Sequence, residues 1–96
     1  MSQRTAVIAS RVGLHARPAA LFAQTAAAAR IPVTIARPGS APVDAASILR
    51  VMALGARCGE TVELTATGPD AEHVLDSLVE LLSTDLDGPA AGPGDS

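Results

Sequence analysis

The chain has 96 residues, of which 48% are hydrophobic, and a formal net charge of −3, which together predict one domain with a modest core. Its basic residues are scattered and Phe22 is its only aromatic residue, which argues against nucleic-acid binding through a basic, aromatic-lined surface. It shows no apolar run of about 18 residues and no secretory leader, and its one cysteine, Cys58, excludes an internal disulfide, so we expect a cytoplasmic protein without membrane insertion.

The first part of the chain predicts a strand, a helix and a second strand. Residues 5–10 are short, apolar-rich and compatible with a strand. Pro18 suits the first turn of a helix, where its missing N–H would have no helical partner, and apolar residues then recur at helical spacing to about residue 30. Pro32 should close this helix, and residues 33–36 alternate as in a strand.

The middle of the chain predicts a turn, a very short strand and a short helix. Residues 37–40 have the composition of a turn, and residues 42–43 can form at most a short edge strand. We expect a helix over residues 47–54, with Ser47 as its N-cap and Gly55 as the residue that stops it.

The last part of the chain predicts a strand and an amphipathic helix. Residues 62–67 alternate between apolar and polar, as in a strand with one buried face. Asp70 can cap the following helix. The apolar stripe of that helix comprises Val74, Leu75, Leu78, Leu81 and Leu82. Residues 87–96 are rich in Gly and Pro and offer little to bury, so we expect a folded domain over residues 1–86 followed by a disordered tail.

The predicted order of elements, β-α-β-β-α-β-α, indicates an α+β fold. Three amphipathic helices can bury their stripes against one face of a four-stranded antiparallel sheet. The other sheet face, which carries Thr34, Glu63 and Thr65, would then face water.

The stretch GLHARPAA, residues 13–20, places His15 at the start of the first helix and Arg17 two residues later. A helix start carries N–H groups without helical partners and a partial positive charge, and it therefore favours anions. A neutral imidazole has a lone pair that can attack phosphorus, and an arginine can add charge-assisted hydrogen bonds to a phosphoryl group. The alternative is that His15 only caps the helix and Arg17 is an ordinary solvated side chain.

The same stretch resembles the signature of the HPr family, the histidine-containing phosphocarriers of the phosphoenolpyruvate-dependent sugar phosphotransferase system. The resemblance continues through SILRVMALG, residues 47–55, and the final Leu-rich helix, and the element order matches the family's open-faced β-sandwich. It implies a carrier without a cofactor, in which His15 accepts a phosphoryl group on Nδ1 from enzyme I and donates it to enzyme IIA domains for sugar uptake. It also implies that Arg17 contacts the phosphoryl group, which the backbone N–H groups of Ala16 and Arg17 would bind.

The short helix is apolar on almost every side, so one face can enter the core while the rest is exposed. The resemblance implies a docking surface for both partners, formed by Ala20, Ile48, Leu49 and Met52. The alternative for the three residues of the short helix is plain core packing. A carrier that visits two partners through one face is most simply a monomer.

Ser47 has two interpretations. In some members of the family the matching serine is phosphorylated by an HPr kinase, but here one extra residue lies within residues 37–43, and Ala46 stands where those members often have lysine. The other interpretation is an ordinary N-cap. A further alternative concerns the whole chain: a regulatory member of the same fold, on a nitrogen-type branch or bound to a regulator, that does not feed sugar transport.

No metal site is predicted. His15, His73 and Cys58 lack the spacing of metal ligands.

The most distant alternative for the function of the chain is an unrelated anion-binding domain that binds phosphate reversibly and forms no covalent adduct.

Overall fold

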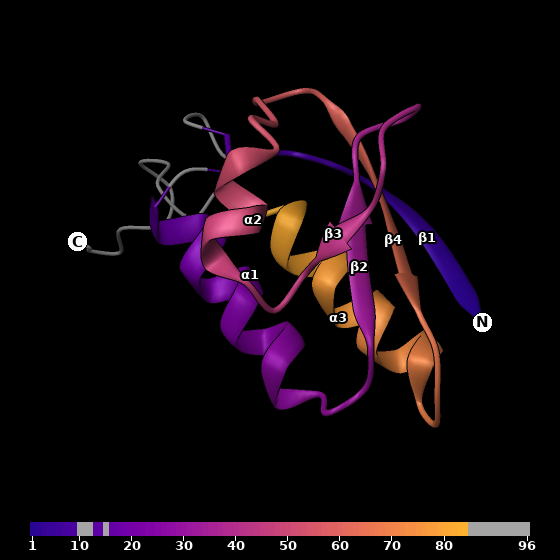
Figure 1. Ribbon diagram of the computed structural model, residues 1–96. Coiled ribbons are helices and arrows are strands. Elements are labelled where there is room, and N and C mark those ends of the chain that lie inside the picture. The colour runs from indigo at the N-terminus through magenta and orange to yellow at the C-terminus, as the bar shows by residue number, and fades with distance from the viewer. Residues whose placement is uncertain (10–12, 15, 85–96) are drawn as a thin grey trace.

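The computed structural model describes residues 1–9, 13–14 and 16–84, which form a four-stranded sheet and three helices. The elements in chain order are β1 (Ser2–Val7), α1 (Ala16–Ala28), β2 (Val33–Ala36), β3 (Val43–Asp44), α2 (Ile48–Ala53), β4 (Thr61–Ala66) and α3 (Ala71–Leu82). All paired strands are antiparallel, and their order across the sheet is β1-β4-β2-β3. Figure 1 shows the helices gathered on one side of this sheet, so the predicted α+β fold is confirmed.

The first strand lies earlier in the chain than predicted. It spans Ser2–Val7 instead of residues 5–10, and it pairs with β4 from Ser2 opposite Ala66 to Val7 opposite Thr61. Ala6 faces the core whereas Val7 faces outward. The prediction followed apolar content, but the extent of β1 is determined by the length of its partner strand. Residue 10 lies outside the described residues.

The first helix ends two residues before the predicted limit of residue 30. The N–H groups of Ala29 and Arg30 donate to carbonyls three residues back, which tightens the last turn. Arg30 then adopts a left-handed conformation with φ of 60°, a position that helices usually give to glycine. The helix therefore stops before Pro32 can act on it.

The two predicted N-caps have different outcomes. Ser47 caps α2, because its Oγ accepts a hydrogen bond from the N–H of Arg50 at 3.3 Å, and Gly55, with φ of 67°, follows the helix end. Asp70 occupies the predicted N-cap position of α3, but its carboxylate makes no capping hydrogen bond to the described residues. The backbone of Asp70 is in the left-handed region, with φ of 61°. A side chain that caps a helix normally reaches the first-turn N–H groups from a residue with an extended backbone.

The core lies between the sheet and the helices, and its large side chains come mainly from β2, β4 and all three helices. The largest fully buried side chains are Phe22, Ile8, Ile35, Leu64, Leu75, Leu78, Val51 and Val62. The alternation predicted for the fourth strand is confirmed, because Val62, Leu64 and Ala66 are buried while Glu63 and Thr65 lie half-buried on the opposite face.

The predicted tail, residues 87–96, lies outside the described residues, so the division after residue 86 stays a prediction. In the part of the chain that the structure describes, no helix has the length and apolar character needed to cross a membrane.

Candidate functional site

The candidate site lies at the start of α1. Ala16 and Arg17 are the first two residues of this 13-residue helix and both are exposed, whereas Pro18 and Ala19 are buried against the core. The first turn of α1 contains no acidic residue, so no carboxylate within it offsets the partial positive charge of the helix start. His15, which directly precedes Ala16 in the sequence, lies outside the described residues, as do residues 10–12.

The backbone before His15 is held against a loop that the sequence did not indicate as part of the site. The N–H of Leu14 donates to the carbonyl of Ala56 at 3.0 Å, and the Leu14 side chain is buried. Gly13 has φ of 73°, and a Cβ added there would lie 2.5 Å from the Ala56 oxygen and 3.0 Å from the Cα of Arg57. Glycine is therefore required at position 13 by both conformation and space.

The exposed part of α2 stands beside the first helix. The side chains of Ile48 and Leu49 are 38% and 76% exposed, whereas Val51 is fully buried. Met52 is half-buried and packs against the core. In this short helix Val51 is anchored in the core and Met52 is half-buried, whereas Ile48 and Leu49 are exposed.

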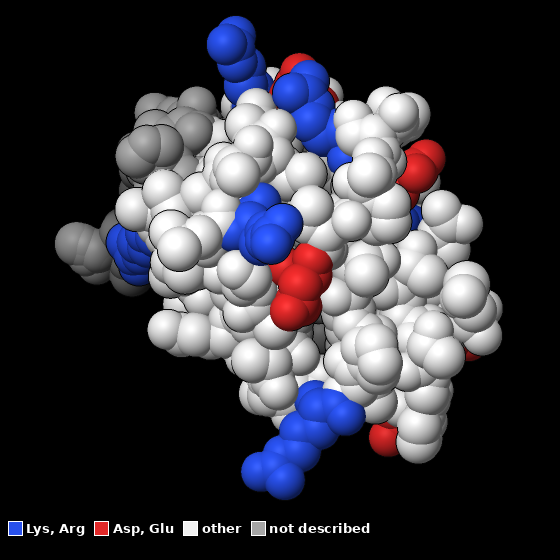
Figure 2. Space-filling model, in the orientation of Figure 1, with Lys and Arg blue, Asp and Glu red and all other residues white. Residues whose placement is uncertain are grey.

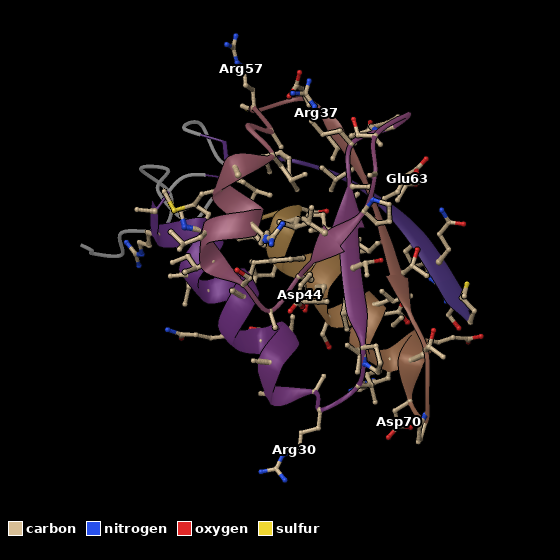
Figure 3. All side chains as sticks on the ribbon, in the orientation of Figure 1. Arg30, Arg37, Asp44, Arg57, Glu63 and Asp70 are labelled. Atoms are coloured by element: carbon tan, nitrogen blue, oxygen red, sulfur yellow. The ribbon has the colours of Figure 1, made fainter. Side chains whose placement is uncertain are left out.

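A shallow groove of about 210 Å³ runs between α1 and the start of α2. It is lined by Ala20, Ala23, Gln24, Ala27, Ala46 and Ile48. The groove thus adjoins two of the four residues predicted for the docking surface, Ala20 and Ile48. Figure 2 shows that the face in view is largely uncharged, and Figure 3 places Asp44 near its middle. A larger and more open hollow, about 570 Å³, lies beside the start of α3, at the end of the molecule that carries Asp70.

The remaining candidate residues are scattered. His73 is exposed on α3, and Cys58 is an exposed free thiol whose Sγ lies 3.8 Å from the carbonyl oxygen of Ala9. Within the described ranges there is no group of three or more His, Cys, Asp or Glu that could hold a metal ion. Ser47 is occupied as the cap of α2, and its neighbour Ala46 donates its N–H to the Asp44 carboxylate at 2.9 Å.

Comparison with known proteins gives a consistent result. A family model described as "PTS HPr component phosphorylation site" matches residues 2–84. The phosphocarrier protein HPr of Streptomyces coelicolor is 41% identical over 87 residues, which cover 91% of this chain and 94% of that protein.

Solved structures agree with this match. The crystal structure of an HPr from Thermoanaerobacter tengcongensis superposes with a TM-score of 0.79 at 40% identity and covers 85% of this chain and 91% of its own. The solution structure of Crh, the catabolite repression HPr of Bacillus subtilis, has a TM-score of 0.66 at 33% identity. The match covers 88% of this chain and 99% of the Crh chain. The similarity therefore extends over the sheet, all three helices and the stretch that contains His15.

Proposed function

Because this chain belongs to the HPr family of phosphocarriers of the phosphotransferase system, we propose that His15 is the residue that carries its phosphoryl group. Members of the family are carriers and not catalytic enzymes, so the proposed role is to accept a phosphoryl group from enzyme I and pass it to enzyme IIA domains for sugar uptake. The observation that carries the proposal is that His15 directly precedes Ala16, where a 13-residue helix begins with no acidic residue in its first turn. We place the protein in the cytoplasm as a monomer.

The proposed chemistry uses the imidazole as a nucleophile and then as a leaving group. The Nδ1 lone pair of neutral His15 attacks the donor's phosphorus, and a P–N bond forms as the donor's bond to phosphorus breaks. The phosphoryl group brings about two negative charges, which the N–H groups of Ala16 and Arg17 and the Arg17 guanidinium stabilise by charge-assisted hydrogen bonds. Attack by an acceptor histidine on enzyme IIA then breaks the P–N bond and returns His15 to the neutral state.

The proposed docking surface comprises Ala20, Ile48, Leu49 and Met52. Its support is the exposure of Ile48 and Leu49 together with the apolar groove that adjoins Ala20. Exposed apolar side chains next to such a groove are typical of a surface that a partner covers. Ala20 and Met52 are half-buried in the fold, so Ile48 and Leu49 are the exposed members of this surface.

The proposal is tested by incubating the chain with enzyme I and phosphoenolpyruvate and measuring its intact mass. We expect one acid-labile phosphoryl adduct on the wild type and none on His15→Ala. The matched control is His73→Ala, which removes the chain's other histidine from the exposed side of α3 and should leave the adduct unchanged. An equal adduct on His15→Ala, or none on the wild type, contradicts the proposal.

A regulatory role without sugar transport is the second candidate, and the similarity to Crh, whose name refers to catabolite repression, is the observation that favours it. The two roles separate in a reconstitution with sugar-specific enzyme II proteins. Sugar phosphorylation that depends on His15 supports the transport role. A chain that enzyme I phosphorylates but that supports no sugar phosphorylation with the enzyme II panel favours the regulatory role.

Phosphorylation of Ser47 by an HPr kinase stays a prediction. The Ser47 Oγ accepts a hydrogen bond from the N–H of Arg50, so the unmodified side chain already serves as the N-cap of α2. We therefore propose the N-cap as the role of Ser47.

A further inference from the structure

One arginine far from His15 in the sequence joins both ends of the loop that holds the site. We name residues 54–60 the support loop, because Ala56 accepts the hydrogen bond of Leu14 and contacts Gly13. Arg37, which directly follows β2, makes an ion pair with Glu60 between Nη2 and Oε2 at 3.0 Å. Its Nη1 also donates to the carbonyl of Leu54 in a longer contact of 3.4 Å.

Glu60 extends this bridge into the middle of the loop. Its second carboxylate oxygen, Oε1, accepts a hydrogen bond from the N–H of Arg57 at 2.8 Å. Both oxygens of one carboxylate are therefore used, one by the Arg37 side chain and one by the loop backbone. Figure 3 shows Arg37 and Arg57 at the same end of the molecule, with the Arg57 side chain pointing outward.

The support loop in turn binds the chain on both sides of residues 10–12. The N–H of Ile8 donates to the carbonyl of Glu60 at 2.9 Å, and the N–H of Gly59 donates to the carbonyl of Ile8 at 2.8 Å. On the other side, Leu14 is bonded to Ala56. The segment that leads into His15 is thus anchored at both ends to a loop whose own ends meet at Arg37.

From this connected set we infer that Arg37 and Glu60 are positioning residues for phosphoryl transfer: they hold the support loop so that Gly13 and Leu14 present His15 at the start of α1. Neither residue touches the phosphoryl group. The inference rests on the proposed function of His15 and adds to it a structural requirement that the signature of residues 13–20 does not contain. Transfer rates are sensitive to such positioning, because a displacement of about 1 Å can cost about a hundredfold in rate.

The main test compares Arg37→Met with a matched control, Arg4→Met. Arg4 makes a similar exposed ion pair, 3.3 Å from Asp76, but it joins β1 to α3, and in the described part of the chain it makes no hydrogen bond or ion pair with the support loop. With enzyme I and phosphoenolpyruvate we expect Arg37→Met to lower kcat about tenfold with KM for the carrier unchanged, and Arg4→Met to leave both unchanged. The inference would be overturned if both variants lost the same factor in kcat, or if Arg37→Met kept the wild-type kcat.

A second variant separates positioning from long-range charge. Glu60→Gln removes a negative charge, so if Arg37 only attracted an acidic partner, this variant would transfer faster and Arg37→Met would mainly raise KM. Positioning instead requires both single variants to be slower and the double variant to be no slower than Arg37→Met alone, because both act through one bridge. Faster transfer by Glu60→Gln overturns the inference.

Hydrogen exchange of the Leu14 amide supplies a readout that is independent of enzyme I. The bond from this amide to Ala56 should open more often in Arg37→Met than in Arg4→Met, at a temperature where both variants are folded. Unchanged exchange contradicts the inference. If the wild type itself is not phosphorylated, the proposed function fails, whereas a phosphorylated wild type with an unaffected Arg37→Met variant overturns the positioning role alone.

Discussion

Space and backbone conformation determine which single residue is tolerated just before the site. Gly13 is the clearest case, because its positive φ and its contact with the Ala56 carbonyl each exclude a side chain. Gly39, in the turn after β2, shares the positive φ, but within the described residues nothing lies within 4 Å of a Cβ placed there. The two glycines therefore separate the conformational cost of a side chain from its steric cost.

Replacing Gly13 with alanine should lower the free energy of unfolding by about 2–5 kcal/mol, the sum of a left-handed alanine and an overpacked contact. Gly39→Ala should cost only about 1–2 kcal/mol, since it has the conformational term alone. Denaturant unfolding of both variants measures the difference. Equal losses would mean that the backbone at residue 13 moves away from Ala56 without penalty.

At the scale of the element, α2 combines packing and exposure within six residues. Val51 is fully buried while Leu49 is 76% exposed, so opposite faces of one short helix serve the core and the surface. Met52 is part of both the core and the surface, since it is half-buried and packs against the core. Substitutions at Met52 would therefore change stability and docking together, and Leu49 is the better probe of the proposed docking surface.

Leu49→Glu should change the free energy of unfolding by no more than about 0.5 kcal/mol, because the side chain is mostly exposed and glutamate is a good helix former. The same substitution should weaken binding to enzyme I by about tenfold or more, since a charge then faces an apolar contact. Titration calorimetry and thermal unfolding measure the two effects.

Val51→Ala is the complementary control for α2. It should cost about 2 kcal/mol of stability and leave enzyme I affinity unchanged while the chain is folded. A Leu49→Glu variant that binds enzyme I normally would remove Leu49 from the docking surface.

The elements also show where sequence patterns suffice. The alternation of residues 33–36 and 62–67 predicts β2 and β4 well, and Ser47 and Gly55 mark the ends of α2, because period and caps are local properties. The limits of β1 were predicted wrongly, since pairing with a strand about 60 residues later determines them. The bridge from Arg37 to Glu60 joins residues 23 apart and has no periodic signal, so only the structure reveals it.

At the scale of the whole molecule, the core consists largely of alanine and aliphatic side chains around a single aromatic ring. Phe22 is fully buried, and the buried cluster around it includes Ala19, Ala26 and Ala45. Small side chains allow close approach but bury little area each. The stability of the fold therefore depends strongly on its few large side chains.

Phe22→Ala should cost about 3–5 kcal/mol, a large part of the roughly 5–15 kcal/mol that stabilises a typical domain. Its neighbour on α1, Leu21, is only half-buried, so Leu21→Ala should cost about 1–2 kcal/mol. Urea unfolding monitored by circular dichroism measures both. A smaller loss for Phe22→Ala than for Leu21→Ala would show that the core does not depend on its ring.

The position of Cys58 has a practical consequence for solution work. The chain has no tryptophan or tyrosine, so it has almost no intrinsic fluorescence, but it has one thiol, which is exposed. That thiol lies beside Ala9 and follows Arg57, whose Cα is next to Gly13. A maleimide dye or a nitroxide would attach at this single place, close to both ends of residues 10–12, and would report partner arrival there without any engineered substitution.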